Sequence, residues 1–246
     1  MSGLGDLGAF IVADCCVNWR SLPELEVLIN VSKGAGANAV KVQVFGEQDI
    51  AGHPRAAELR KLILAEEKLD EIRRFCDRVN VPLGVTVTDT VSVEWAAPLA
   101  RYLKIRYADR YNEELIDMAL ETGKEVHLSC DLRYINDPAT GEIVANPRVS
   151  PLYCVPEYPP TEPPDFPDFF CQKFAGFSSH YPDLMVPYVA WRVGARILEV
   201  HVKLPKYPPE WVPIDNAVSL STRNLKTLRE YTSGESAFKP ATGVRR

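Results

Sequence analysis

The chain has 246 residues with 28 Lys and Arg against 33 Asp and Glu, which gives a formal net charge of −5 at pH 7. Charges of both signs are interspersed, and no basic tract indicates a nucleic-acid partner. No stretch approaches the roughly 18 consecutive apolar residues of a membrane span, and the N-terminal residues show no charged and apolar signal pattern, so we expect neither membrane insertion nor secretion.

The six cysteines lack the spacing of a zinc ribbon. Cys15, Cys130 and Cys154 fall at or just after apolar segments, where buried thiols are common. We therefore expect reduced thiols and a cytoplasmic location.

Eight apolar segments alternate with amphipathic ones along the chain. They are rich in Val, Ile and Leu, as expected for strands that are buried on both faces. The predicted strands are Phe10–Asp14, Ala39–Val44, Pro82–Val87, Tyr102–Arg106, Glu125–Cys130, Val149–Cys154, Phe174–Ser179 and Arg196–Val202.

The segments between these strands predict helices. Ser21 is a candidate N-cap of the first one, and Gly36, Gly123 and Gly194 stand where three of them should end. The predicted helices are Leu22–Lys33, Ala56–Asn80, Val91–Leu99, Asn112–Thr122, Tyr181–Val193 and Ser221–Thr232.

Repeated βα units predict an α/β protein with a (β/α)8 TIM barrel rather than an open doubly wound sheet. No Gly-x-Gly-x-x-Gly follows the first strand. We expect one domain over residues 1–233 and a flexible tail over 234–246. The fifth βα unit is irregular, because Asp131–Arg148 contains Asn, Asp, Pro and Gly and is predicted as a loop or hairpin. Pro156–Pro167 is Pro-rich and is not expected to begin as a helix.

Polar residues at the carboxyl ends of the strands indicate an active site, since TIM barrels carry theirs at that face. Glu199 and His201 are two apart on a strand and project to one side, toward His180 at the end of the preceding strand. Two imidazoles and a carboxylate suit a divalent transition metal with open positions. The alternative is that each histidine is an isolated polar residue with satisfied hydrogen bonds.

Two lysines lie within predicted barrel strands, where burial is costly unless an opposite charge meets them. Lys41 and Lys104, together with the hydroxyls of Ser129 and Ser178, suit a phosphate and a carboxylate. An internal salt bridge to a barrel carboxylate is the alternative for either lysine. The Arg106 side chain could point into the barrel or, equally, outward between the helices.

Several segments, in chain order, resemble motifs of the sialic acid synthase family, over roughly residues 9–230. The resemblance is greatest around the second strand, and the eighth strand also matches. The segments are Phe10–Asn18, Gly36–Phe45, Tyr102–Ile105, Leu128–Ser129, Tyr153–Pro159, Gly176–His180, Gly194–His201 and Pro213–Leu220.

The resemblance implies a transferase that condenses phosphoenolpyruvate with an aldehyde or sugar acceptor, using a divalent metal, Mn²⁺ first, with Mg²⁺, Co²⁺, Zn²⁺ or Fe²⁺ as alternatives. His180 and His201 would bind the metal. Substrate-binding residues would be Lys41, Gln43, Thr86, Lys104, Ser129, Tyr158 and Ser178, and catalytic ones Asp14, Glu199 and Asp215. A carboxylate near the attacking water is a plausible general base.

The chain also departs from the family pattern. Asp14 replaces the usual Glu, while Trp19, Tyr107, Pro156 and Ser179 stand where the family carries other residues. The family's C-terminal antifreeze-like domain is not expected here, which leaves a homodimer or a separate acceptor-binding partner open. Two alternatives therefore stay open for the function: a metal-dependent lyase, aldolase or isomerase on a phosphorylated or carboxylated ligand, or a non-catalytic barrel that acts as a binding subunit.

Overall fold

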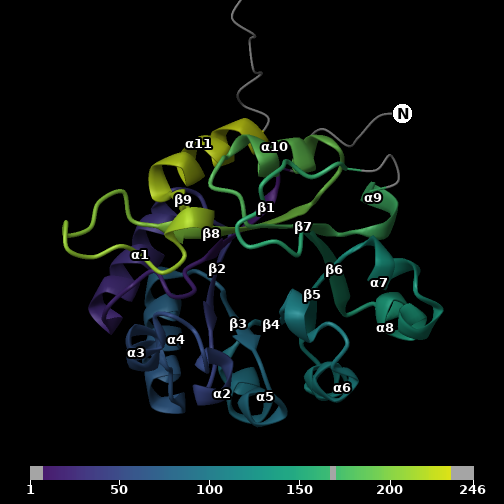
Figure 1. Cartoon of the computed structure of the whole chain (residues 1–246), viewed down its shortest axis with the longest axis horizontal. Coiled ribbons are helices and arrows are strands. Elements are labelled where there is room, and N and C mark those ends of the chain that lie inside the picture. The colour runs from purple at the N-terminus through teal and green to yellow at the C-terminus, as the bar shows by residue number, and fades with distance from the viewer. Residues whose placement is uncertain (1–7, 167–169, 234–246) are drawn as a thin grey trace, which may run out of the picture.

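Eight parallel strands form a closed barrel with helices around it (Figure 1). The computed structural model describes residues 8–166 and 170–233. Each strand pairs with the next in parallel, and β1 pairs with β8 to close the cylinder, so the predicted TIM barrel is confirmed. The strands are β1 (Phe10–Asp14), β2 (Ala39–Gln43), β3 (Leu83–Val87), β4 (Tyr102–Ile105), β5 (Glu125–Cys130), β6 (Val149–Cys154), β7 (Gly176–Ser179) and β8 (Ile197–Lys203), and the short β9 (Leu220–Ser221) pairs with the end of β8.

The helices bury one face against the barrel. Their bounds are α1 (Leu22–Gly34), α2 (Glu47–Ile50), α3 (Ala56–Leu59), α4 (Glu66–Val79), α5 (Thr90–Ala96), α6 (Glu113–Glu121), α7 (Leu132–Asn136), α8 (Gly141–Ala145), α9 (Phe170–Lys173), α10 (Met185–Arg192) and α11 (Thr222–Thr232). Ser21 caps α1, as predicted. Gly36, Gly123 and Gly194 follow α1, α6 and α10 in the left-handed region that ends helices. In the described ranges, no helix is long and apolar enough to cross a bilayer.

The prediction of one helix over Ala56–Asn80 was wrong. The segment consists of α3, a 3-10 turn at Arg60–Leu62, an extended break and α4. Leu62 and Leu64 are both buried although they are only two residues apart. An extended segment can bury both, whereas one face of a continuous helix cannot.

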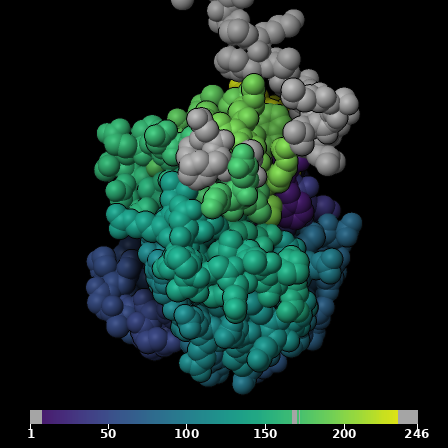
Figure 2. Space-filling model, turned by 90° about the vertical axis from the view of Figure 1, so that its right-hand side faces the viewer, coloured from purple at the N-terminus to yellow at the C-terminus, as the bar shows by residue number. Residues whose placement is uncertain are grey.

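The irregular fifth unit is confirmed, but it is neither a plain loop nor a hairpin. Asp131 caps α7, and Asp137 caps a 3-10 turn at Pro138–Thr140 that leads into α8. Together with α6, these short helices lie on the face seen in Figure 2, which is formed mostly by the teal middle of the chain.

The start of one other helix differs from the prediction. Helix α10 begins at Met185, four residues after the predicted Tyr181, because the Asp183 carboxylate accepts a hydrogen bond from the Met185 N–H there. Residues 156–166 contain no helix or strand, as predicted. The predicted tail over 234–246 lies outside the described residues.

The barrel interior is built in layers because alternate strand residues point inward. Val12, Ala39 and Tyr102 form an apolar layer, with Ile197 packed against it. Two residues further along each of these strands come Asp14, Lys41, Lys104 and Glu199, all buried. The register therefore places a charged layer directly above an apolar floor.

Gly176 of β7 is required by this close packing. A Cβ at Gly176 would overlap the backbone carbonyl of Ile197 on β8. We predict that Gly176→Ala lowers the free energy of unfolding by about 3 kcal/mol, because overpacking forces the strands apart.

Gly34→Ala is the matched control, since no atom lies within 4 Å of a Cβ placed there. Urea denaturation measures both variants. Equal stabilities for the two would contradict this account of β7–β8 packing.

Candidate active site

A cavity of about 430 Å³ opens at the carboxyl ends of the strands. It brings together every residue that the sequence singled out for the site except Thr86, which is completely buried and meets the cavity only through Lys41. The lining includes Asp14, Lys41, Gln43, Lys104, Ser129, Tyr158, Ser178, His180, Glu199, His201 and Asp215. The structure thus places these side chains around one cavity, while their individual roles stay predictions.

The floor of the cavity is a buried network of two lysines and two carboxylates. The Lys41 Nζ lies 2.8 Å from the Asp14 Oδ2 and 3.4 Å from the Glu199 Oε1, and it donates to the Thr86 hydroxyl at 3.0 Å. The Lys104 Nζ lies 3.6 Å from the same Glu199 oxygen. Glu199 therefore lies between two ammonium groups.

The hydroxyls of two serines complete the network. Lys104 donates to the Ser129 hydroxyl, and the Ser178 hydroxyl donates to the Glu199 Oε1 at 2.9 Å. The other Glu199 oxygen, Oε2, is buried without a hydrogen-bond partner among the described residues. One carboxylate oxygen thus makes all of these contacts.

The charged groups of this network shift one another's pKa values. Burial disfavours the charge on Lys41, but Asp14 and Glu199 outweigh burial and raise the pKa of Lys41 above its ordinary value. Burial lowers the pKa of Lys104, and Lys41 lowers it further. Burial would raise the pKa of Glu199, yet Lys104 and Lys41 hold it well below its usual range. Glu199 is consequently an ionised carboxylate at neutral pH.

Two imidazoles stand above the lysines. His180 follows β7 and His201 lies in β8, and their ring centroids are 5.3 Å apart. Burial, and then the neighbouring His201, lower the pKa of His180 to about 3. The ring of Tyr158 packs edge-on against both imidazoles, and its hydroxyl donates to the Asp215 Oδ1 at 2.6 Å. His180 is therefore a neutral imidazole, the form that binds metal ions.

The polar atoms around the imidazoles fit a divalent cation. The His201 Nδ1 and the Asp215 Oδ2 face each other at 3.6 Å, and neither has a hydrogen-bond partner within the described part of the chain. Buried polar atoms normally have partners, so this pair is best explained by a ligand that both atoms contact. Imidazole nitrogens and a carboxylate oxygen are suitable donors for a transition metal.

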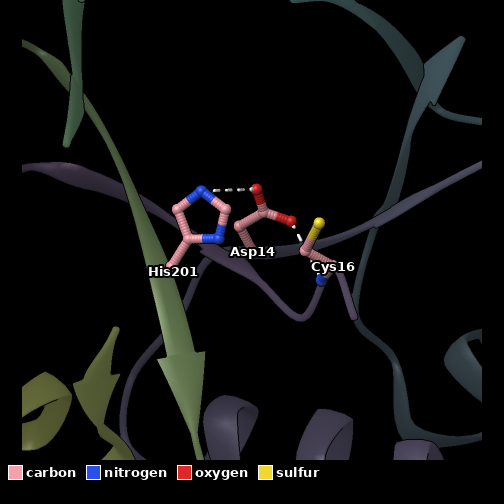
Figure 3. A group of neighbouring side chains, drawn as sticks. All are labelled: Asp14, Cys16 and His201. Carbon is pink, nitrogen blue, oxygen red and sulfur yellow. Dashed lines mark hydrogen bonds and ion pairs between the residues drawn. The ribbon is translucent and has the colours of Figure 1, made fainter. Parts of the chain in front are cut away.

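Sequence reasoning missed Cys16. Its thiol lies close to the Asp14 carboxylate and the His201 imidazole, and the three side chains project to the same side (Figure 3). Burial, and then Asp215 and Asp14, raise the pKa of this thiol. Cys16 lies beyond the end of β1 and has a left-handed backbone, so the strand period gave no signal for it.

Arg106 lines the cavity, which settles the direction left open by the sequence. It forms ion pairs with Asp49 at 2.9 Å and Asp109 at 2.5 Å. Asp49 also lines the cavity and was not singled out from the sequence. These pairs leave the Arg106 guanidinium neutralised at the cavity wall.

Asn18 fixes the loop that carries Asp215. Its amide donates to the Val202 carbonyl at 2.9 Å and to the Ser219 hydroxyl at 2.8 Å, and its carbonyl oxygen accepts from the Asp215 N–H at 3.0 Å. Asn18 is completely buried. It acts on the site through the backbone that positions Asp215.

Comparison with known proteins identifies the family. Residues 28–237 match the sequence model of the NeuB family. The chain belongs to the NeuB family. The resemblance to sialic acid synthases is thereby confirmed, and the chain is a sialic acid synthase-like condensing enzyme.

Individual NeuB relatives are distant in sequence. The N-acetylneuraminate-9-phosphate synthase of Homo sapiens is 22% identical over 252 residues, covering 91% of this chain and 69% of that protein. The N-acetylneuraminic acid (sialic acid) synthetase from Leptospira borgpetersenii serovar Hardjo-bovis superimposes with a TM-score of 0.79 at 21% identity, covering 96% of this chain and 88% of the other.

A second group of structures shares the barrel. A truncated 3-deoxy-D-arabino-heptulosonate 7-phosphate synthase from Thermotoga maritima gives a TM-score of 0.65 at 17% identity, covering 93% of this chain and 86% of the other. At such identities the likeness shows the fold, and the chemistry of this NeuB-family chain has to be argued from its own residues.

The charge of Glu199 offsets both buried lysines. We predict that Glu199→Gln, which keeps the shape of the side chain, lowers the free energy of unfolding by about 3 kcal/mol, because two buried ammonium groups lose a shared counter-charge. Glu142→Gln is the control, since Glu142 is an exposed glutamate on α8.

Urea denaturation at neutral pH measures both variants. An unchanged free energy of unfolding for Glu199→Gln would show that Asp14 alone stabilises the lysines.

Proposed function

We propose that the chain condenses phosphoenolpyruvate with an aldehyde-bearing sugar, and that a divalent metal bound by His180 and His201 assists the reaction. One observation carries the proposal: two buried lysines and two neighbouring imidazoles face a single cavity of about 430 Å³. That volume suits a three-carbon phosphate together with a sugar.

The lysine layer supports the phosphoenolpyruvate half of the proposal. Lys41 and Lys104 would bind its carboxylate and phosphate, helped by the Ser129 and Ser178 hydroxyls. Charge-assisted hydrogen bonds from ammonium groups are among the stronger interactions available to such anions. Thr86 would serve by orienting Lys41, to which its hydroxyl is bonded.

The imidazoles support the acceptor half. A divalent metal bound there would act as a Lewis acid on the aldehyde carbonyl. Gln43, Tyr158 and Asp215 line the same cavity and would orient the acceptor. Tyr107 and Pro156 also line it, so the acceptor meets a surface different from that of other family members.

The chemistry requires a carbon–carbon bond and one water. The methylene carbon of phosphoenolpyruvate attacks the aldehyde carbon, water adds to C2, and phosphate leaves to give a keto acid. Both oxygens of Asp14 are engaged, one by Lys41 and one by the Cys16 N–H. The Glu199 Oε2 has no such partner. Asp14 and Glu199 therefore both stay candidates for the carboxylate that would accept the proton from water.

Phosphate release from phosphoenolpyruvate tests the reaction. With Mn²⁺ and a panel of aldoses and hexosamines, we expect release that requires both the metal and one class of acceptor. Lys104→Met should lower kcat/KM at least about 100-fold, because it removes a charged contact to the reacting anion. Lys124→Met, on the outside of the barrel where Lys124 donates to the Ala100 carbonyl, is the control.

No release over a broad panel of acceptors and metals, together with no phosphoenolpyruvate-dependent rise in Tm, would contradict the proposal. A bound metal in that case would favour a lyase, aldolase or isomerase instead.

Metal content tests the imidazole pair separately. We predict that His180→Ala lowers the bound metal to below about a tenth of the wild-type level, because the site loses one of its principal ligands. His53→Ala is the control, since His53 is an exposed histidine whose Nδ1 accepts from the Arg55 N–H. Elemental analysis after dialysis measures both variants, and equal metal content would place the ion elsewhere.

A further inference from the structure

The thiol of Cys16 lies among atoms that can bind a metal. Its Sγ, an imidazole nitrogen of His201 and a carboxylate oxygen of Asp14 all lie within 4.8 Å of one another (Figure 3). Tetrahedral ligands at 2.0–2.3 Å from an ion stand roughly 3.3–3.8 Å apart. A small rotation of these side chains is therefore enough for a shared ion.

The backbone holds Cys16 in this position. Its φ is +30°, a left-handed conformation that is uncommon for a residue with a side chain. The Trp19 indole donates to the Cys16 carbonyl at 2.8 Å, and the Cys16 N–H donates to the Asp14 Oδ1 at 3.1 Å. The thiol makes a weak contact at 3.5 Å with the Gln43 Oε1.

A second observation points to a ligand beside the same imidazole, whose Nε2 faces Asp14 and whose Nδ1 faces Asp215. The His201 Nδ1 and the Asp215 Oδ2 are buried and lack hydrogen-bond partners within residues 8–166 and 170–233. Asp215 also lies close enough to the Cys16 thiol to influence it electrostatically. The Cys16 sulfur, the His201 imidazole and the carboxylates of Asp14 and Asp215 thus lie close together, and the His180 ring lies next to the His201 ring.

We propose that Cys16 supplies a thiolate ligand to the metal site of His180 and His201, with Asp215 completing the set. The inference rests on the metal site of the proposed function. A thiolate favours Zn²⁺, Co²⁺ or Fe²⁺ over Mn²⁺ or Mg²⁺, so this chain uses a softer ion than the Mn²⁺ that its resemblance to the family implies. The thiol proton leaves to solvent when the metal binds.

Cys154 is the rival thiol. It lines the same cavity, and its Sγ lies 3.9 Å from the His180 Nδ1. However, the Cys154 thiol donates to the Val155 carbonyl at 3.5 Å, and it does not join the group of potential ligands around His201. Any test therefore has to separate Cys16 from Cys154.

Cobalt spectroscopy on the full-length chain provides that test. Co²⁺ added to the metal-free protein should give a near-ultraviolet sulfur-to-cobalt charge-transfer band, and Cys16→Ser should abolish this band. The same variant should weaken Zn²⁺ binding at least about 100-fold, while changing Mn²⁺ binding less than about 3-fold.

Two variants serve as controls. Cys15→Ser alters the adjacent buried thiol, which contacts only the Ala13 carbonyl among the hydrogen bonds of the described residues. Cys154→Ser alters the rival. Both should keep the band. No band in the wild type, or a band lost only in Cys154→Ser, would overturn the proposal.

A measurement on the wild type covers the case in which Cys16→Ser does not fold. Zn²⁺ should protect Cys16 from iodoacetamide, as read by mass spectrometry, and Mg²⁺ should not. Equal labelling with and without Zn²⁺ would overturn the proposal.

The two proposals fail in different ways. A cobalt–thiolate band without phosphate release from phosphoenolpyruvate would contradict the proposed reaction and leave the assignment of Cys16 as a ligand standing. Metal-dependent phosphate release without the band would contradict the assignment of Cys16 as a ligand and leave the proposed reaction standing.

Discussion

Two ammonium groups lie inside a closed barrel, and the structure depends on how they are neutralised. Lys41 and Lys104 reach the same Glu199 oxygen at 3.4 and 3.6 Å, and of the two lysines Lys41 also contacts Asp14. Uncompensated charges of this kind would be very costly to bury. Glu199 meets both lysines with one oxygen and, together with Asp14, balances their two positive charges. The two ammonium groups are the part of this floor that an anionic substrate would contact.

The parallel register turns this floor into a site. Because side chains alternate along each strand, the same period that places the charged residues above an apolar layer also directs His201 and Gln43 one step higher. The loops then add His180, Asp215 and Cys16. Asn18 and Trp19 hold these loops through backbone hydrogen bonds, so positions that touch no ligand help to set the geometry of the site.

Much of this arrangement was predictable from the sequence. Eight apolar segments alternating with amphipathic ones predicted the barrel. The spacing of Glu199 and His201, two apart on one strand, predicted that both side chains point the same way. Three features were not predictable in this way. The break between α3 and α4 depends on tertiary burial of Leu62 and Leu64. The inward direction of Arg106 depends on Asp49, which is distant in sequence. The thiol of Cys16 depends on a left-handed backbone that no periodic pattern encodes.

Lysines from β2 and β4 and imidazoles from β8 and the end of β7 line one cavity, and we infer that they act together there. Anomalous diffraction from crystals soaked with Co²⁺ and phosphoenolpyruvate tests this claim most directly. We expect a metal peak within bonding distance of His180 and His201, with the phosphate and carboxylate of phosphoenolpyruvate against Lys41 and Lys104. A metal peak elsewhere, or phosphoenolpyruvate bound outside the barrel mouth, would contradict it.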